Sequence, residues 1–328
     1  MSAGFGDLSV GNTELKIVLH YEVGSEFASR LEQLADSGLE IAVCPVVERE
    51  RFAREMSDAE VLWHFLEPVT FDVIEASPEL RLIQKIGVGV NTIDLEAARK
   101  RNIRVCNMPG TNSRAVAEAS LALMFAAMRR VVSFDVATRR GDGWNWNPEL
   151  QDQLFEMGGR CVGLVGYGSV PRILAPILLA LGAEVIYCAP GPKADAIGEF
   201  CALSELLARA DIISLHVPLD QQTRHMIDAK ALATMKPGAV LVNTARGGLV
   251  DEAALIQALK HGPLRAAGLD TFEQEPTPRD NPLLRLDNVV VMPHVAWLTT
   301  DSLDRSLVVA VENCRRLASD EPLLHQVV

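Results

Sequence analysis

The sequence of 328 residues predicts an α/β protein with two domains, each built on a doubly wound parallel sheet. Three observations support this prediction. Short apolar runs alternate with amphipathic segments, which is typical of parallel β-α-β units. The alternation occurs in two series, one ending near residue 107 and one beginning near residue 160. The length suits two domains of ordinary size, and 48% of the residues are hydrophobic, enough to form substantial cores.

The first series contains five predicted strands, at 15–20, 39–43, 59–65, 81–86 and 103–107. Gly38 follows a helical pattern that starts at Phe27, and glycine is common just past a helix C-terminus. A helical stretch over roughly 113–139 comes next, and the polar segment 141–153 is predicted to be a loop.

The second series contains six predicted strands, at 161–166, 184–188, 211–217, 239–243, 264–270 and 288–292. Segment 300–318 is predicted to be a helix. Because it follows the second series, it can pack back onto the first domain and make that domain discontinuous.

Composition excludes several classes of protein. The net charge of −12 disfavours a nucleic-acid surface, which needs clustered positive charge. The six cysteines show no Cys-x-x-Cys spacing, which argues against a zinc site or a secreted disulfide framework. Residues 1–12 lack the basic and apolar regions of a signal peptide, and no run reaches the ~20 apolar residues of a membrane span. We expect a cytoplasmic protein without a metal site and without a membrane or nucleic-acid partner.

A phosphate-binding turn is predicted between the strand that begins at 161 and the helical pattern after it. Gly166 and Gly168 form a Gly-x-Gly sequence there, and such a turn lets free N–H groups at a helix N-terminus face a pyrophosphate. Pro171 replaces the third glycine of the dinucleotide fingerprint, although proline is tolerated in a first helical turn. Alone, the motif also fits an ordinary tight turn.

The second strand of this unit ends without the acidic residue that usually bonds the adenosine ribose. Ala189 stands in that place, and Lys193 follows it. Loss of the acid removes repulsion against a 2′-phosphate, and Lys193 can supply a compensating charge, although it can equally be an exposed loop lysine. The sequence therefore favours NADP over NAD, with both open.

Arg246, Glu275 and His294 each follow a predicted strand of the second series. Ligands of open α/β sheets bind outside the carboxyl ends of the strands, so these residues converge if the strands are neighbours. Histidine suits proton donation to a 2-oxo group, a carboxylate on its other ring nitrogen stabilises the imidazolium, and arginine can hold a substrate carboxylate. Singly, each residue also has a purely structural interpretation.

With these residues the chain resembles the D-isomer-specific 2-hydroxyacid dehydrogenase family over about 15–325. The resemblance rests on NTARGGLVDE, LDTFEQEP, MPHVAW, HVPLDQQT and IGVGVNTIDLEAA, and on SRAVAEASLALMFAAMRR, which is similar to the family's interdomain helix. It implies a Rossmann cofactor domain, 113–295, inserted into a flavodoxin-like substrate domain, 1–112 and 296–328. It also implies a homodimer, formed through the cofactor domain and its long helix.

The resemblance further implies roles for single residues. Arg246 would bind substrate, His294 would be the acid and base, and Glu275 its partner. Backbone N–H groups of Val88 and Gly89 would receive the substrate carboxylate. The cofactor would contact residues along five segments of the second domain: Gly166, Gly168, Ser169, Val170, Lys193, Pro218, Thr223, Thr244, Ala245 and Asp270.

Three departures from the family pattern are Pro171, Ala189 and Trp297, the last in a place where the family usually has a small residue. The Trp297 ring is expected to narrow the substrate pocket or to pack at the domain boundary. Trp63 and His64 follow a strand of the first domain and are expected to form a buried pair or to reach the substrate.

Two alternative functions remain open from the sequence. Corepressor proteins of the C-terminal-binding type share this fold and the three catalytic residues but act as nucleotide-sensing scaffolds. Formate- and phosphite-oxidising relatives use other substrates, although formate enzymes usually have glutamine at the position of Glu275. The identity of the 2-hydroxy acid is not determined by the sequence.

Overall fold

The computed structural model describes residues 15–35 and 38–328, so the expectation for the first dozen residues lies outside the described part. The chain divides into two compact units. Unit 1 consists of Met1–Asn112 with Thr299–Val328, and unit 2 consists of Ser113–Leu298. In the described ranges, no helix combines the length and the apolar composition needed to cross a membrane.

Unit 1 contains a five-stranded parallel sheet in the order β2-β1-β3-β4-β5, the order of flavodoxin-like folds. Its strands are β1 (Leu15–His20), β2 (Leu39–Cys44), β3 (Val61–His64), β4 (Leu82–Lys85) and β5 (Arg104–Cys106). β3 and β4 are buried along their whole length because helices cover both faces of the sheet.

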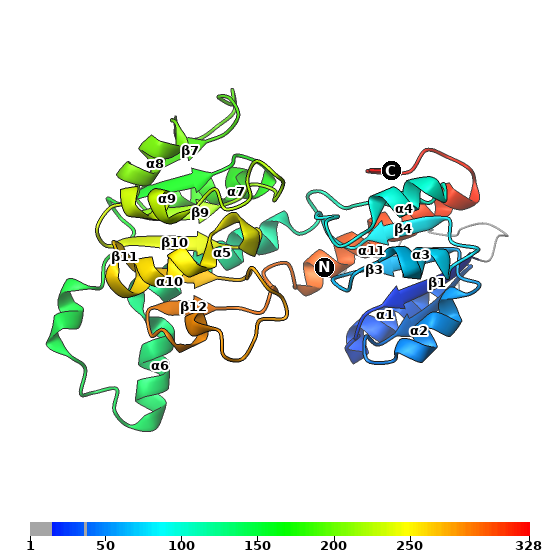
Figure 1. Cartoon of the computed structure of the whole chain (residues 1–328), viewed down its shortest axis with the longest axis horizontal. Coiled ribbons are helices and arrows are strands. Elements are labelled where there is room, and N and C mark those ends of the chain that lie inside the picture. The colour runs from blue at the N-terminus through cyan, green and yellow to red at the C-terminus, as the bar shows by residue number, and fades with distance from the viewer. Residues whose placement is uncertain (1–14, 36–37) are drawn as a thin grey trace. The chain divides into compact units, whose positions relative to one another are not determined.

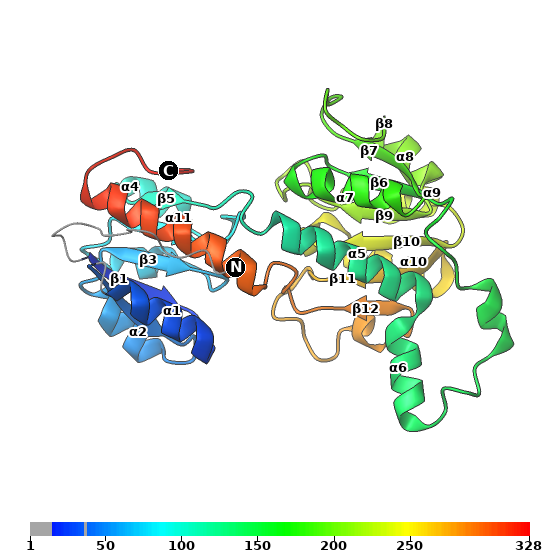
Figure 2. The same ribbon diagram turned by 180° about the vertical axis from the view of Figure 1, so that it is seen from behind.

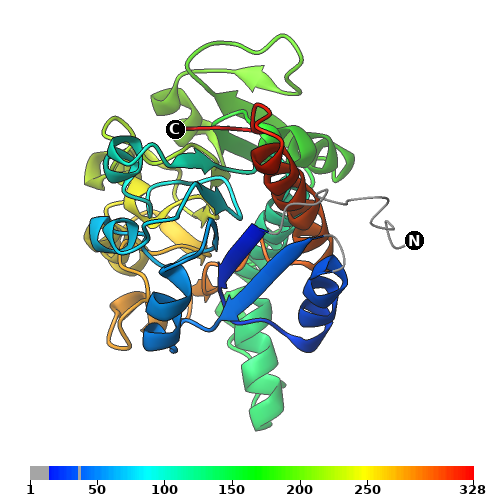
Figure 3. The same cartoon turned by 90° about the vertical axis from the view of Figure 1, so that its right-hand side faces the viewer.

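The helices of unit 1 are α1 (Ser25–Ala35), α2 (Arg49–Met56), α3 (Phe71–Glu75), α4 (Leu95–Lys100) and α11 (Thr300–Ala318). One core joins α2, α3 and α4 to the sheet. On the other face α1 and α11 are linked by an ion pair between Arg30 and Asp304 at 2.8 Å, and Figure 3 shows the blue α1 and the red-brown α11 on that side. α11 therefore returns the chain to unit 1, as predicted.

Unit 2 contains a seven-stranded sheet in the order β12-β11-β10-β9-β6-β7-β8, with every pairing parallel. Counted from β6, this is the Rossmann order 3-2-1-4-5-6 with a seventh strand added. The strands are β6 (Cys161–Val165), β7 (Glu184–Cys188), β8 (Glu199–Phe200), β9 (Ile212–Leu215), β10 (Ala239–Asn243), β11 (Leu264–Leu269) and β12 (Val289–Val291).

Two cores cover the two faces of this sheet. One includes α8 (Leu203–Arg209), α9 (Ala229–Thr234) and α10 (Glu252–His261), and the other includes α5 (Ser113–Arg129) and α7 (Ser169–Ala180). Figure 1 shows α8, α9 and α10, and Figure 2, seen from behind, shows α5 and α7 in front of the sheet. The α/β class and both sheet types agree with the sequence prediction.

Three local predictions need correction. The single helix expected over 113–139 is two helices, α5 and α6 (Val131–Arg140), because Arg130 adopts a left-handed backbone with φ +50°. The segment 141–153 contains a short 3-10 helix, Pro148–Asp152, which begins at a proline. β8 was not predicted, because two exposed residues carry no strand periodicity. The eleven predicted strands are all present, to within two residues at each end.

Candidate active site

The glycine turn between β6 and α7 has the geometry of a dinucleotide site. Gly166 has φ +97°, and a Cβ there would lie 2.7 Å from the carbonyl oxygen of His216, so only glycine fits. Gly168 is the N-cap of α7, and a Cβ built on it would meet nothing within 4 Å. Open space therefore lies beside the first turn of α7, whose N–H groups have no acceptor in an earlier turn. A pyrophosphate at this turn would face the N–H groups of Ser169 and Val170.

Arg246 is held by the end of β10. The buried Asn243 side chain accepts a hydrogen bond from the N–H of Ala245 at 3.0 Å and donates one to the carbonyl oxygen of Arg246 at 2.8 Å. The Thr244 hydroxyl lies 2.8 Å from that of Ser120 on α5. Burial lowers the pKa of Arg246 from its ordinary value, and the negative charge of Glu275 opposes this effect. The guanidinium is thus a partly desolvated cation on a rigid turn.

Glu275 and His294 form a hydrogen-bonded pair. His294 Nδ1 lies 2.6 Å from Glu275 Oε2, and Glu275 Oε1 accepts the N–H of Phe272 at 2.9 Å. Burial opposes ionisation of Glu275. This effect is outweighed by the hydrogen bond and charge of His294, by the N–H of Phe272 and by the charge of Arg246. The pKa of Glu275 is therefore below its ordinary value. Because Nδ1 is used in this bond, Nε2 is the ring nitrogen of His294 that would contact a ligand.

Asp270, at the end of β11, positions the loop that carries His294. Its carboxylate accepts the N–H groups of Val295 and Ala296 at 2.8 and 2.9 Å, and its carbonyl oxygen accepts the N–H of His294 at 2.7 Å. Burial raises the pKa of Asp270, and the two backbone hydrogen bonds oppose that rise. These bonds maintain His294 in a left-handed conformation with φ +57°. The indole N–H of Trp297 donates to the carbonyl oxygen of His294 at 2.9 Å, so this ring also stabilises the loop.

A third segment ties the arginine turn to the glutamate loop. The backbone N–H of His225 donates to the carbonyl oxygen of Gly248 at 2.8 Å, and its ring Nε2 lies 2.8 Å from Glu273 Oε1. Gly247 packs so closely on this loop that a Cβ would lie 1.9 Å from the carbonyl carbon of Phe272. The turn of Arg246 and the loop of Glu275 are therefore in direct backbone contact, and His225 links both.

The segment with the predicted adenosine contacts lies directly before His225. The Thr223 hydroxyl donates to the carbonyl oxygen of Pro218 at 2.7 Å, which closes a tight loop after β9. Lys193 is exposed, and its backbone N–H donates to the hydroxyl of Tyr187 at 2.9 Å. Ala189 follows β7 and packs against the core on the α7 side of the sheet.

The predicted carboxylate loop of unit 1 lies after β4. The carbonyl oxygens of Gly87 and Val88 accept hydrogen bonds from the backbone of Met108 at 2.8 Å and the side chain of Asn107 at 2.9 Å. In a trans peptide the N–H points opposite to the carbonyl. The N–H groups of Val88 and Gly89 therefore point away from residues 107–108.

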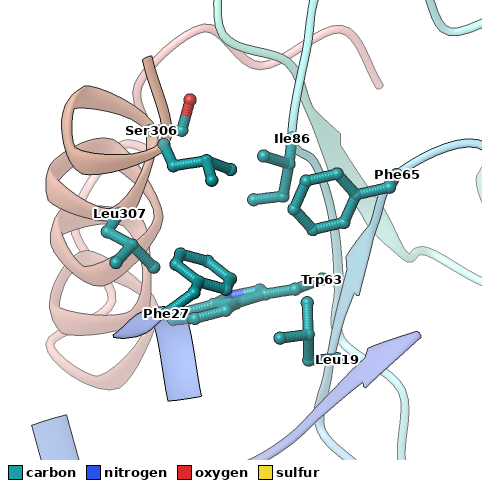
Figure 4. Close-up of a pocket in the computed structure, with 8 residues that line it drawn as sticks. Leu19, Phe27, Trp63, Phe65, Ile86, Ser306 and Leu307 are labelled. Atoms are coloured by element: carbon teal, nitrogen blue, oxygen red, sulfur yellow. The ribbon is translucent and has the colours of Figure 1, made fainter. Parts of the chain in front are cut away.

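Trp63 and His64 are buried. Trp63 is fully inaccessible and lies among Leu19, Phe27 and Leu307 in an apolar space too small for a water molecule (Figure 4). His64 Nε2 is bonded to the carbonyl oxygen of Glu67, and burial lowers the pKa of His64 to about 3. Of the two interpretations of this pair, the structure supports the buried one.

Sequence reasoning missed Asn243 and His225. A polar residue ending the buried strand AVLVN was a usable signal for Asn243. No local pattern marks His225, because its role depends on two loops that are distant in sequence. Within 15–35 and 38–328, no group of three metal-binding side chains comes together.

The fold and the glycine turn define a nucleotide-binding α/β protein, and comparison with known proteins identifies its family. The family model described as "D-isomer specific 2-hydroxyacid dehydrogenase, NAD binding domain" matches residues 121–296. The chain belongs to the D-isomer-specific 2-hydroxyacid dehydrogenase family.

Three relatives illustrate the extent of the similarity. A glyoxylate reductase of Korarchaeum cryptofilum is 40% identical over 79% of this chain and 79% of its own. A D-3-phosphoglycerate dehydrogenase of Methanocaldococcus jannaschii is 38% identical over 86% of this chain, which spans only 54% of that relative. The crystal structure of the TT0316 protein from Thermus thermophilus has a TM-score of 0.87 and 36% identity, covering 96% of this chain and 100% of that one.

Family membership confirms the prediction of an NAD(P)-dependent dehydrogenase and favours it over the corepressor-like alternative. It also confirms that unit 2 contains a nicotinamide-dinucleotide domain.

Proposed function

We propose that this protein interconverts 2-oxo acids and D-2-hydroxy acids through Arg246, Glu275 and His294. The observation that carries the proposal is the Glu275–His294 hydrogen bond at 2.6 Å, on a loop in backbone contact with the turn of Arg246. A bound nicotinamide would supply or accept the hydride. The residues of the chain would supply proton transfer, charge stabilisation and orientation.

In the direction of reduction, His294 Nε2–H donates a proton to the oxygen of the 2-oxo group. The ionised Glu275 holds Nδ1–H and stabilises the imidazolium before transfer. The Arg246 guanidinium binds the substrate carboxylate and polarises the 2-oxo group, and its partial burial strengthens both interactions. Oxidation uses the same groups in reverse, with neutral His294 accepting the proton of the hydroxyl.

The remaining ligand contacts follow the geometry of each unit. We propose that unit 1 is the substrate domain and that the N–H groups of Val88 and Gly89 receive the substrate carboxylate, because they point away from residues 107–108. Trp297, fixed by its bond to the His294 loop, would limit the size of the substrate side chain. Small substrates such as glyoxylate and hydroxypyruvate fit this arrangement, and both names occur among the relatives.

We propose NADP(H) as the preferred cofactor. Ala189 offers no carboxylate at the end of β7, and Lys193 follows on an exposed loop. In the cofactor site, the nicotinamide end would be bordered by Thr244, Ala245 and Asp270. The adenosine end would be bordered by Pro218 and Thr223. A clearly higher kcat/KM with NADH than with NADPH would contradict this preference.

The test of the proposed function is a panel of 2-oxo acids with NADH and with NADPH, followed by variants. His294→Ala is expected to lower kcat by about 100-fold or more, because it removes the general acid, with a smaller change in KM. Arg246→Ala should damage both kcat and KM. A protein that binds cofactor but turns over no member of the panel would overturn the proposal, as would an unchanged kcat in His294→Ala.

We also propose a homodimer formed through α6 and the loop after it. These elements extend away from the sheet of unit 2 (Figures 1 and 2), and they expose Val131 by 52%, Val132 by 48% and Trp144 by 87%. Apolar side chains gathered on a projecting element are typical of a protein interface. Light scattering should give the mass of two chains, and Val132→Asp with Trp144→Ser should give one. The buried, unpaired cysteines are consistent with a cytoplasmic location.

A further inference from the structure

The loop 189–198 after β7 is fixed over the first turn of α7. Its backbone is held at two points by tyrosine hydroxyls: Tyr187 accepts the N–H of Lys193 at 2.9 Å, and Tyr167 contacts both the N–H and the carbonyl oxygen of Ile197, at 2.7 and 3.1 Å. It is the green segment that projects past β7 in Figure 1. Ala189 stands at the start of this loop, where an acidic residue usually bonds the ribose. Other residues of the loop must therefore supply the groups that contact the cofactor's ribose.

Arg172 reaches this loop from the helix. It lies in the first turn of α7, three residues after Ser169, and its guanidinium forms an ion pair with Asp195 of the loop. The guanidinium carbon also lies 5.6 Å from the centre of the Tyr167 ring, the residue between the two turn glycines. A cation and an anion from the two elements that border the dinucleotide turn are therefore paired with each other.

We propose that Arg172 is the ligand for the 2′-phosphate of NADP(H) and that Asp195 sets the choice between the two cofactors by competing for it. The proposal rests on the nicotinamide cofactor of the proposed function. A guanidinium presents forked N–H donors that match a phosphate, and arginine near the second strand of a Rossmann unit can serve this purpose. NAD(H) carries no 2′-phosphate. When it is bound, Asp195 stays paired with the guanidinium, so no unpaired cation is left.

Exchange of partners is energetically feasible because the pair is largely in water. The side chains of Arg172 and Asp195 are 39% and 66% exposed, and ion pairs at such exposure contribute little to stability. A 2′-phosphate would carry more negative charge than the carboxylate and would repel it. Neutralising Asp195 should therefore strengthen NADP(H) binding, and removing the charge of Arg172 should weaken it.

The experiment is direct cofactor binding without a 2-oxo acid, followed by the fluorescence of NADPH and NADH. Arg172→Gln should raise the Kd for NADPH by about 10-fold or more, the worth of a charge-assisted hydrogen bond, and that for NADH by less than about threefold. Asp195→Asn should lower the Kd for NADPH by about threefold or more and change the Kd for NADH by less than about threefold.

Two matched variants complete the design. Arg209→Gln removes one positive charge from a half-buried arginine that pairs with Glu199 and Glu205, and it should change neither Kd by more than about threefold. Lys193→Gln tests whether Lys193, and not Arg172, binds the 2′-phosphate. It should raise the Kd for NADPH less than Arg172→Gln does.

Retained NADH binding shows that each variant is folded. Equal loss of both cofactors in Arg172→Gln would overturn the proposal, because it would place Arg172 at the shared pyrophosphate. An unchanged NADPH affinity in that variant, or a selective loss in Lys193→Gln alone, would overturn it too. Failure of the proposed function has a different signature: cofactor binding that responds to Arg172 while no 2-oxo acid is reduced.

Discussion

Replacing Glu275 with glutamine tests the proton-transfer part of the proposed reaction. The Glu275 carboxylate lies 2.6 Å from His294 Nδ1, and glutamine keeps the shape of the side chain while removing its charge. The depressed pKa of Glu275 means that the wild-type carboxylate is ionised throughout the neutral range. In the variant the imidazolium of His294 loses this counter-charge, so reduction of 2-oxo acids should suffer more than oxidation of hydroxy acids.

The magnitude follows from Coulomb's law. Charge centres about 4 Å apart interact by about 4 kcal/mol at an effective dielectric constant of about 20. The two side chains are 34% (Glu275) and 19% (His294) exposed, so water screens the pair. We therefore halve the figure to about 2 kcal/mol. This energy corresponds to about a 30-fold change in a rate or equilibrium constant.

The assay is kcat for reduction and for oxidation at one neutral pH. Reduction by Glu275→Gln should be about 30-fold slower than in the wild type, and oxidation should lose less. Asp280→Asn, an exposed acid on the same connection between β11 and β12, is the matched control and should leave both rates unchanged. Equal loss of the two rates in Glu275→Gln, or no loss, would refute the electrostatic role of Glu275.

Three further outcomes are expected. His225→Ala should lower kcat by about 10-fold or more with little change in cofactor KM, because the loop of Glu275 loses the bond between the His225 ring and Glu273. His225→Gln can still donate to Glu273 and should restore most of the activity. Equal kcat values in the two variants would contradict a positioning role. Burial lowers the pKa values of His64 and His216 to about 3. As the pH falls, these two histidines are therefore protonated in the unfolded chain before they are protonated in the folded protein. Denaturant titrations should show the free energy of unfolding falling as the pH drops from 6.5 toward 3, with a limiting slope of about 1.4 kcal/mol per pH unit for each residue. His216→Gln should remove this contribution from the unfolding of unit 2 and leave that of unit 1. Trp63→Ala should cost about 3–5 kcal/mol in the unfolding of unit 1, measured by urea denaturation, and a loss below about 1 kcal/mol would mean that the core refills the space.

The order of strands along the chain could be predicted because fully buried parallel strands appear as continuous apolar runs. AVLVN and EVIYC coincide with β10 and β7. The positions of Arg246, Glu275 and His294 followed from the same patterns, since residues just past parallel strands lie at one edge of the sheet. Hydrophobic pattern is a local property, and a sequence displays it directly.

Backbone conformations that depend on distant partners could not be predicted in this way. Arg130 breaks one helical pattern into two, and His294 is left-handed because Asp270 accepts the N–H groups of the residues that follow it. Nothing in either local sequence requires these conformations. The conformation of His294 is stable because the hydrogen bonds of Asp270 compensate its cost.

The sequence by itself thus determined the two parallel-sheet domains, the family and the chemical types at the reaction centre. Only the tertiary structure decided which other side chains hold the residues of the candidate site in position. The contact of His225 with Glu273 joins residues 48 apart, and the pair of Arg172 with Asp195 joins residues 23 apart. Such contacts arise from chain folding and leave no periodic signal. Consequently the reaction class can be read from the sequence, whereas the proposed cofactor choice and the alignment of the candidate catalytic groups depend on packing between loops.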